Sequence, residues 1–154
     1  MSTHLLPTHI ATANLRRRRL PTVAALGAAI IAAVIVSDSV NALIATIARA
    51  SGVSDSFQPL QFGTYTALTV AGIIVGAIGW QVVRNRAARP FWLLSRLVPI
   101  VLVLSFVPDI LVGINHSQVG TTWGGVIALM GMHIVVAASA VAGYATFLPV
   151  KRTS

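Results

Sequence analysis

The chain contains no cysteine, no glutamate and only three aspartates among its 154 residues. The absence of cysteine excludes disulfides, thiolate metal sites and cysteine nucleophiles. The absence of glutamate excludes the histidine–glutamate zinc motif of metalloproteases. The sequence also has no glycine-rich phosphate loop and no GxSxG turn, so the motifs of soluble catalytic domains are missing.

Charge of either sign is scarce. Charged residues make up 9% of the chain and hydrophobic residues 56%, with a mean hydropathy of +0.85. A soluble domain usually has roughly a quarter charged residues. Too little polar surface remains to cover a water-soluble globule, so the sequence predicts a membrane protein, and its length predicts one domain.

The chain does contain four long apolar runs, at about 20–48, 62–83, 91–113 and 123–148. Each is long enough, as a helix, to cross a hydrocarbon core of ~30 Å. The sequence therefore predicts an all-α, up-down-up-down, four-helix transmembrane bundle. This membrane domain, at 20–150, follows a basic tail at 1–19 and precedes a short tail at 151–154.

The positions of the basic residues predict the orientation of these spans. Eleven lysines and arginines give a net charge of +8. Only Arg49 lies near the first or third turn, and the other ten fall into three groups: Arg16 to Arg19; Arg84, Arg86, Arg89 and Arg96; and Lys151 with Arg152. The positive-inside rule then predicts a multi-pass protein of the cell membrane with both termini in the cytoplasm. Anionic lipid is the expected partner of these clusters, rather than nucleic acid.

Two of the three aspartates fall inside the apolar runs. Asp38 lies 18 residues after Leu20, and Asp109 lies 18 residues after Phe91, so each is ~27 Å along its span. Both carboxylates are therefore expected in the outer half of the membrane, with Asn41 one helical turn from Asp38.

Other polar residues are expected at similar depths. His133 is ten residues into the fourth span, ~15 Å deep and near the midplane. The second span enters from outside, which places Tyr65, Thr66 and Thr69 in the outer layer. Ionisable groups inside a membrane are costly and usually mark functional sites. We therefore predict an inward-facing polar cavity formed by Asp38, Asn41, Asp109 and His133.

A structural role for the same residues is the alternative. Asp38 would approach the headgroups if its helix tilts strongly, and Asp109 would cap the helix after Pro108 or pair with Arg49. His133 would donate a single hydrogen bond between helices. No local spacing supports a metal site, and no cofactor is expected.

A glycine stripe marks one face of the second span. Gly72, Gly76 and Gly79 fall on the same side of the helix as Thr69. Small residues let another helix backbone approach closely. The stripe predicts either packing within the bundle or the seam of a homo-oligomer.

Three functions remain open on the sequence alone. The first is binding of a small ligand, or proton-linked transport, through the outer polar cavity. The second is a membrane-embedded enzyme that uses Asp109 and His133 as an acid–base pair. The third is an accessory subunit of a larger membrane complex.

Three sequence strings carry a resemblance to a known family: Asn41-Ala-Leu-Ile-Ala-Thr-Ile-Ala-Arg-Ala-Ser-Gly-Val53, Leu104-Ser-Phe-Val-Pro-Asp-Ile110, and Ala128-Leu-Met-Gly-Met-His-Ile-Val-Val-Ala-Ala138. With the four-span layout, they resemble a family of small bacterial four-helix membrane proteins classed as a domain of unknown function. The resemblance covers roughly residues 17–150. It implies the fold and a bacterial inner-membrane location, and it implies no activity.

Overall fold

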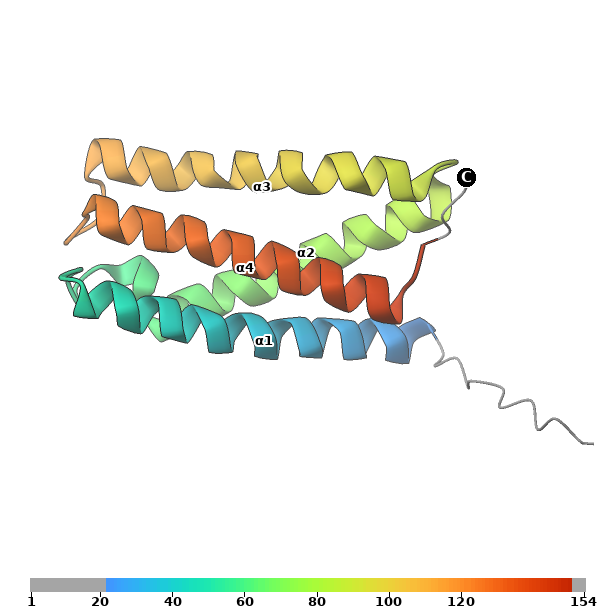
Figure 1. Ribbon diagram of the computed structural model, residues 1–154, viewed down its shortest axis with the longest axis horizontal. Helices are drawn as coiled ribbons and strands as arrows, with labels where there is room; N and C mark the ends of the chain where they lie inside the picture. The colour runs from blue at the N-terminus through green and yellow to red at the C-terminus, as the bar shows by residue number, and fades with distance from the viewer. Residues whose placement is uncertain (1–21, 151–154) are drawn as a thin grey trace, which may run out of the picture.

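The computed structural model describes residues 22–150, which form four long helices (Figure 1). In chain order these are α1 (Thr22–Ala50), α2 (Phe62–Arg86), α3 (Pro90–Asn115) and α4 (Trp123–Phe147), with a 3-10 helix η1 (Gln58–Leu60) before α2. Each of the four is long and apolar enough to cross a membrane. The all-α four-helix prediction is confirmed, while the predicted tails at 1–19 and 151–154 lie outside the described residues.

The helices end close to the limits of the apolar runs. The largest difference is at the end of α2, which continues three residues further, to Arg86, while α1 and α3 each continue two residues further, to Ala50 and Asn115. Between α2 and α3 the chain turns sharply, because a proline disfavours helical geometry in the residue before it. Arg89 has φ −128° and ψ 70°, and Pro90 then occupies the first turn of α3, where its missing N–H costs little.

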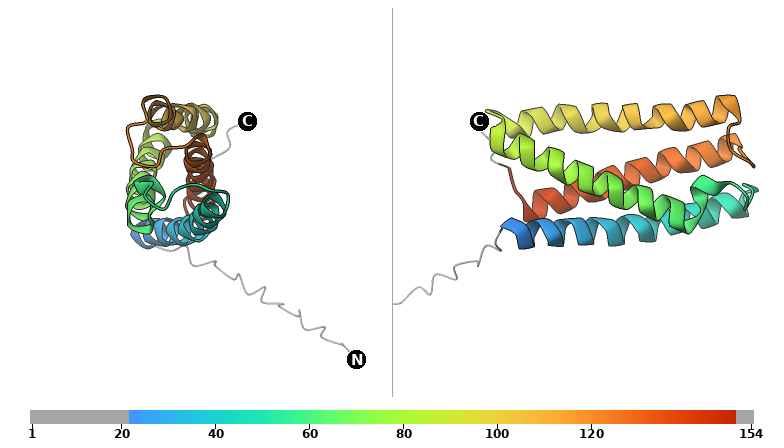
Figure 2. Two further views of the ribbon diagram at one scale, coloured as in Figure 1. Left: turned by 90° about the vertical axis from the view of Figure 1, so that its left-hand side faces the viewer. Right: turned by 180° about the vertical axis from the view of Figure 1, so that it is seen from behind.

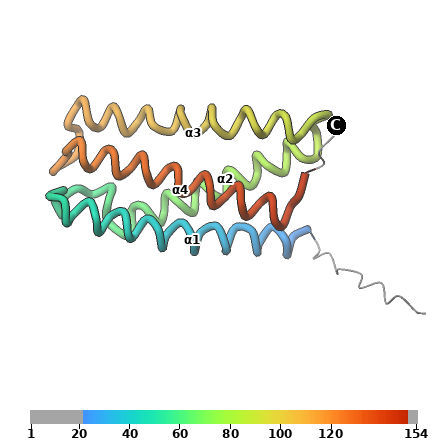
Figure 3. Tube along the Cα trace, in the orientation of Figure 1, coloured from blue at the N-terminus to red at the C-terminus, as the bar shows by residue number. Residues whose placement is uncertain are grey.

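Two internal prolines, Pro99 and Pro108, do not interrupt α3. Figure 3 shows α3 running the length of the bundle without a sharp bend. Pro108 cannot donate to the carbonyl of Leu104, four residues earlier, so the helical hydrogen-bond ladder has a gap there. Membrane helices tolerate such gaps because small local adjustments of the backbone take up the freed groups.

The four helices surround the bundle axis with α1 and α3 on opposite sides (Figure 2). The closest packing in the bundle is between α1 and α4, and α2 runs diagonally from α1 towards α3 (Figure 1). One end of the bundle, here called the basic end, carries the α2–α3 turn at residues 87–89. The other, the loop end, carries the two longer connections at residues 51–61 and 116–122.

Small residues explain how closely α1 approaches α4. Ala25, Ala29 and Ala33 form a buried row on α1. Opposite them, a Cβ placed on Gly143 would lie 3.0 Å from the carbonyl oxygen of Ala29. Close backbone approach of this kind is how membrane helices gain packing energy without a hydrophobic driving force.

The glycine stripe of α2 faces α4 along part of its length. A Cβ on Gly76 would lie 3.3 Å from the hydroxyl oxygen of Tyr144, and one on Gly72 would lie 4.0 Å from a methyl of Val136. Gly79 has no such neighbour within 4 Å. The Tyr144 hydroxyl also donates a hydrogen bond to the carbonyl of Ile73. Gly76 is therefore in close contact with α4 and Gly72 lies at the edge of the same contact, although both are exposed positions, and a homo-oligomer seam on this stripe stays a prediction.

A short cap covers the loop end. Val53, Phe57 and Leu60 fold back from the α1–α2 connection and are buried. Arg49 fixes this cap, because its guanidinium donates to the Leu60 carbonyl at 2.6 Å and lies 3.3 Å from an oxygen of Asp55. Arg49 is thus engaged at the surface of the loop end.

The apolar core has two parts. One lies at the loop end and includes the cap, with Ala45, Ala48, Tyr65, Leu129 and Met132. The other lies toward the basic end and consists of Ala25, Ala29, Ala33, Ile73, Ala77, Trp80, Leu94, Ala140, Tyr144 and Leu148. Leu94 is the only fully buried contribution of α3 to these two clusters among the described residues.

Replacing Gly143 with alanine should destabilise the bundle. The new Cβ would press on the α1 backbone at Ala29, and overpacking of this kind costs roughly 1–3 kcal/mol. The check is the thermal unfolding midpoint of the full chain in mild detergent, followed by circular dichroism. Gly131→Ala is the matched control, because its Cβ would lie an ordinary 3.9 Å from Ile44. Equal midpoints for the two variants would contradict the close α1–α4 approach.

Candidate functional site

Two polar residues interrupt the row of alanines on the buried face of α1. Read every four residues, this face runs Ala25, Ala29, Ala33 and then Ser37 and Asn41, before alanine returns at Ala45. Ser37 and Asn41 are both 0% exposed. Two polar side chains are therefore held between the two apolar cores, where water cannot solvate them freely.

The neighbouring helix α2 provides a hydrogen-bond partner for one of these polar side chains. Thr69 lies on the α2 face between Tyr65 and Ile73 and is buried. The Asn41 side-chain amide donates a hydrogen bond to Thr69 Oγ1 at 3.2 Å. This bond joins α1 to α2 inside the bundle.

On the other side, Asp109 of α3 meets His133 of α4. Asp109 is buried, and its Oδ2 lies 3.1 Å from His133 Nδ1. The same nitrogen is 2.9 Å from the Leu129 carbonyl oxygen. Both oxygens are acceptors, so Nδ1 carries a proton in either charge state of the ring. The ring also meets Phe106 edge-on, with centroids 6.3 Å apart.

The polar residues on the four helices all lie in the loop half of the bundle, at depths that differ by about one helical turn. Counted from the loop end of its helix, Asp109 is ~9 Å deep, Thr69 ~10 Å, Asn41 ~14 Å and His133 ~15 Å. With Ser37 just below, they form what we call the polar layer: Ser37, Asn41, Thr69, Asp109 and His133. It crosses the loop half of the bundle between the two apolar cores.

Several oxygens in and beside this layer are buried without a hydrogen-bond partner. They are Ser37 Oγ, Asp38 Oδ1, Asn41 Oδ1, Thr66 Oγ1 and Asp109 Oδ2. Asp109 Oδ2 is close to His133 Nδ1 but off the line of its N–H, which points to Leu129. An unsatisfied buried acceptor costs roughly 1–3 kcal/mol, so a partner that donates hydrogen bonds would be stabilised here.

The four residues of the predicted cavity divide into two places. Asp109 and His133 meet at the α3–α4 seam, while Asn41 is bonded to Thr69 at the α1–α2 seam. Asp38 is half-buried and forms no ion pair among residues 22–150.

The alternative ion pair between Asp109 and Arg49 is wrong. Arg49 binds Asp55 and the Leu60 carbonyl in the cap, and Asp109 contacts His133 instead. The reason is depth, since Arg49 ends α1 at the surface while Asp109 lies more than one turn inside α3.

Sequence reasoning gave no role to Ser37, although it lies deepest in the layer. The sequence signal that identifies Ser37 is its position four residues before Asn41, which places both residues on the helix face that also carries Ala25, Ala29 and Ala33. Among the described residues, no group of three His or Asp side chains comes close enough to hold a metal ion. The available chemistry is hydrogen-bond acceptance, negative charge and one exchangeable imidazole proton.

Comparison with known proteins places the chain in a family. Searches among curated proteins and among solved structures each gave no significant match. One family model matches residues 11–149, a stretch that includes all four helices and both seams of the polar layer. On this match, the chain belongs to the family of unknown function named DUF6069.

Proposed function

We propose that this protein binds a small cation or hydrogen-bond donor in the polar layer and exchanges a proton at His133 as the ligand enters or leaves. The observation that carries the proposal is the buried Asp109 Oδ2, which has no hydrogen-bond partner and lies beside His133, in a layer where α1 and α2 hold further unpartnered oxygens. We further propose that it resides in the cell membrane with the basic end in the cytoplasm.

The chemistry of the unpartnered atoms restricts which class of ligand can bind. The Asn41 amide oxygen accepts hydrogen bonds only, and so do the carboxylate oxygens of Asp38 and Asp109 when ionised. A second acceptor, such as an anion, would add repulsion to groups that already lack donors. An alkali ion or a small ammonium compound would satisfy them, because both are attracted to carboxylate and amide oxygens.

Charge balance links this ligand to a proton. A charged group in the membrane interior is costly unless it is compensated. His133, when protonated, compensates Asp109 at 3.1 Å, and a bound cation would compensate the same carboxylate. One carboxylate is neutralised by a single positive charge, and a second positive charge beside it would itself be uncompensated in the membrane. Binding of the cation and protonation of His133 should therefore compete.

The α3–α4 seam offers a route to the layer. The cap of Val53, Phe57 and Leu60 covers the loop end, whereas the His133 side chain is 37% exposed at the seam. The inner face of α3 is sparsely packed, with Pro90, Leu94, Asp109 and Gly113 as its buried residues. A ligand would therefore approach His133 first and Asp109 behind it.

A membrane-embedded enzyme is the second candidate. Asp109 beside Nδ1 leaves Nε2 of His133 available for proton transfer, which is how a carboxylate orients a general base. The two candidates are distinguished by whether the ligand is chemically changed. An enzyme releases a product that differs from its substrate, whereas a binding protein releases the ligand unchanged.

The basic residues support the proposed orientation, and the aromatic residues support the proposed span of the membrane. Arg84, Arg86 and Arg89 lie at the basic end, and such clusters remain cytoplasmic by the positive-inside rule. Trp92 and Trp123 are more than half exposed near opposite ends of the bundle, as expected of residues that anchor the two membrane interfaces.

Cysteine labelling tests this orientation directly, because the chain has no cysteine of its own. Ser54→Cys and Ser117→Cys, both at exposed loop-end positions, should react with a membrane-impermeant maleimide on intact cells. Asn85→Cys at the basic end should react only after lysis. The opposite pattern would overturn the orientation.

Ligand binding should raise the thermal stability of the full chain in mild detergent, since a ligand specific for the folded state stabilises it. The probes are Na⁺, K⁺ and methylammonium chlorides at matched ionic strength, with choline chloride as reference. We expect at least one probe to raise the unfolding midpoint, and to do so more at pH 8 than at pH 5.5, because histidine charges across this range.

Asp109→Asn should abolish this stabilisation, and His133→Gln should remove its pH dependence. Asp55→Asn is the matched control, since that carboxylate lies in the cap and its side chain is 92% exposed. The proposal fails if no probe stabilises the protein, or if Asp55→Asn and Asp109→Asn reduce the effect equally.

A further inference from the structure

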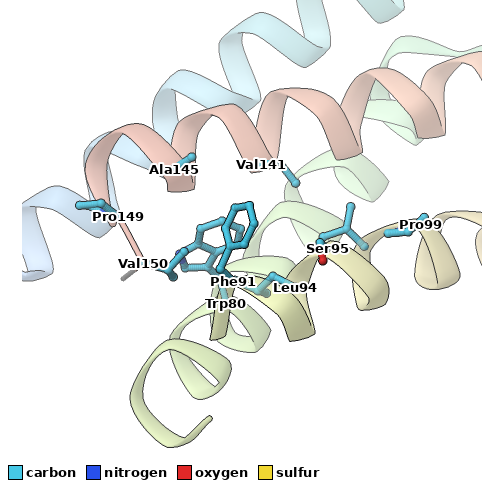
Figure 4. A pocket seen from close by; sticks show the side chains of 10 residues that line it. Trp80, Phe91, Leu94, Ser95, Pro99, Val141, Ala145, Pro149 and Val150 are labelled. Atoms are coloured by element: carbon cyan, nitrogen blue, oxygen red, sulfur yellow. The ribbon is translucent and has the colours of Figure 1, made fainter. Parts of the chain in front are cut away.

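A groove lies at the basic end, far from the polar layer (Figure 4). Its volume is about 450 Å³, and it lies between the first turns of α3 and the last turns of α4. Figure 4 shows the Trp80 and Phe91 rings side by side in it, with α3 on one side and α4 on the other. The lining residues are Trp80, Phe91, Leu94, Ser95, Val98, Pro99, Val141, Ala145, Pro149 and Val150.

The lining favours a hydrocarbon occupant. Ser95 is the only residue of the lining with a side-chain hydroxyl, and that hydroxyl donates to the Trp92 carbonyl of its own helix at 2.8 Å. The Trp80 ring N–H likewise donates to the Leu148 carbonyl at 3.0 Å. The two polar side chains of the groove wall thus already have partners within the protein, so the lining offers mainly apolar contact to its occupant.

Positive charge surrounds the same end of the bundle without an acid to balance it. Arg84, Arg86, Arg89 and Arg96 lie within the last turn of α2, the turn and the start of α3. The three aspartates of the chain all lie nearer the loop end, and none of these four arginines forms a carboxylate ion pair in the described part of the chain. Phosphate oxygens are a natural counter-charge for such a cluster.

One of these arginines shares a helix face with a residue of the groove wall. Arg84 follows Trp80 by four residues, so both lie on the same face of α2, with Arg84 one turn nearer the basic end. Arg84 is half-buried and contacts Gln81 Oε1 at 3.3 Å. Arg96 is different, because its guanidinium stacks over the Trp92 ring at 5.4 Å on an exposed part of α3.

We propose that the groove binds an anionic phospholipid, with one acyl chain along Trp80 and Leu94 and the phosphate at Arg84. The apolar groove supplies the site for the chain, and the unbalanced arginines supply the preference for a negative headgroup. This site is independent of the polar layer, and its occupant comes from the bilayer itself.

The test uses the fluorescence of Trp80 in the full chain in mild detergent. Trp92→Phe and Trp123→Phe, both at exposed positions, leave Trp80 as the single fluorophore. Phosphatidylglycerol or phosphatidylcholine with brominated acyl chains is then titrated in, because bromine quenches tryptophan on contact. Quenching should saturate, and phosphatidylglycerol should half-saturate at about fivefold lower mole fraction, the factor expected of one arginine beside a headgroup of net negative charge. Phosphatidylcholine carries the same phosphate, but its choline group balances the charge.

Two matched pairs of variants identify the site. Arg84→Gln should remove the preference for phosphatidylglycerol, while Arg96→Gln should keep it. Ala145→Phe, which fills the groove, should weaken quenching by both lipids, while Ala142→Phe, at an exposed α4 position outside the groove, should not. Ser95→Phe fills the groove from α3 and provides a second blocking variant if Ala145→Phe does not fold.

The outcomes that overturn the proposal are distinct. Equal half-saturation by the two lipids in the parent chain would exclude headgroup selection. Equal loss in Arg84→Gln and Arg96→Gln would indicate general surface attraction rather than a site. Full quenching in both folded groove-filling variants would place the lipid elsewhere.

Discussion

A polar side chain in hydrocarbon must find its partner inside the protein, and this constraint organises the interior of the bundle. The close contact of α1 with α4 at Ala29 and Gly143 leaves no room for lipid between these helices. The same row of α1 continues into Ser37 and Asn41, so the packing that holds the two helices together also carries two polar groups into the core. Their burial is then a consequence of helix register.

The position of α3 depends on the same constraint more directly. Most of its large apolar side chains are exposed, as suits contact with lipid, and little of its length packs against the other helices. Leu94 holds it near the basic end, and Gly113 packs against Trp123 and Val126 near the loop end. Asp109 with His133 is the polar contact between these two points. A group that replaced His133 as the partner of Asp109 would therefore also act on how α3 is held.

The sequence predicted the spans and the depth of the polar residues, because both follow from counting along apolar helices. The sequence did not predict which side of each helix faces the interior of the bundle. A helix that is apolar all round carries no pattern that identifies its inner face. Asp38 and Ser37 differ by one residue and about 100° of rotation, and the buried one is Ser37 rather than the carboxylate. For the same reason, the pairing of Asp109 with His133 rather than Arg49, and the groove beside Trp80, required the arrangement of the helices.

The chain separates its charges along the bundle axis. The aspartates lie in the loop half and the described arginines other than Arg49 lie near the basic end, with an apolar core between them. Opposite charges in one membrane protein would ordinarily be drawn into pairs, and each pair would neutralise the groups that could recognise something else. Under the two proposals made above, this separation would leave Asp109 able to meet a cation or the histidine proton, and the arginines able to meet phosphate. Arg49 lies at the loop end with the aspartates. It is paired with Asp55, and the pair holds the cap in place.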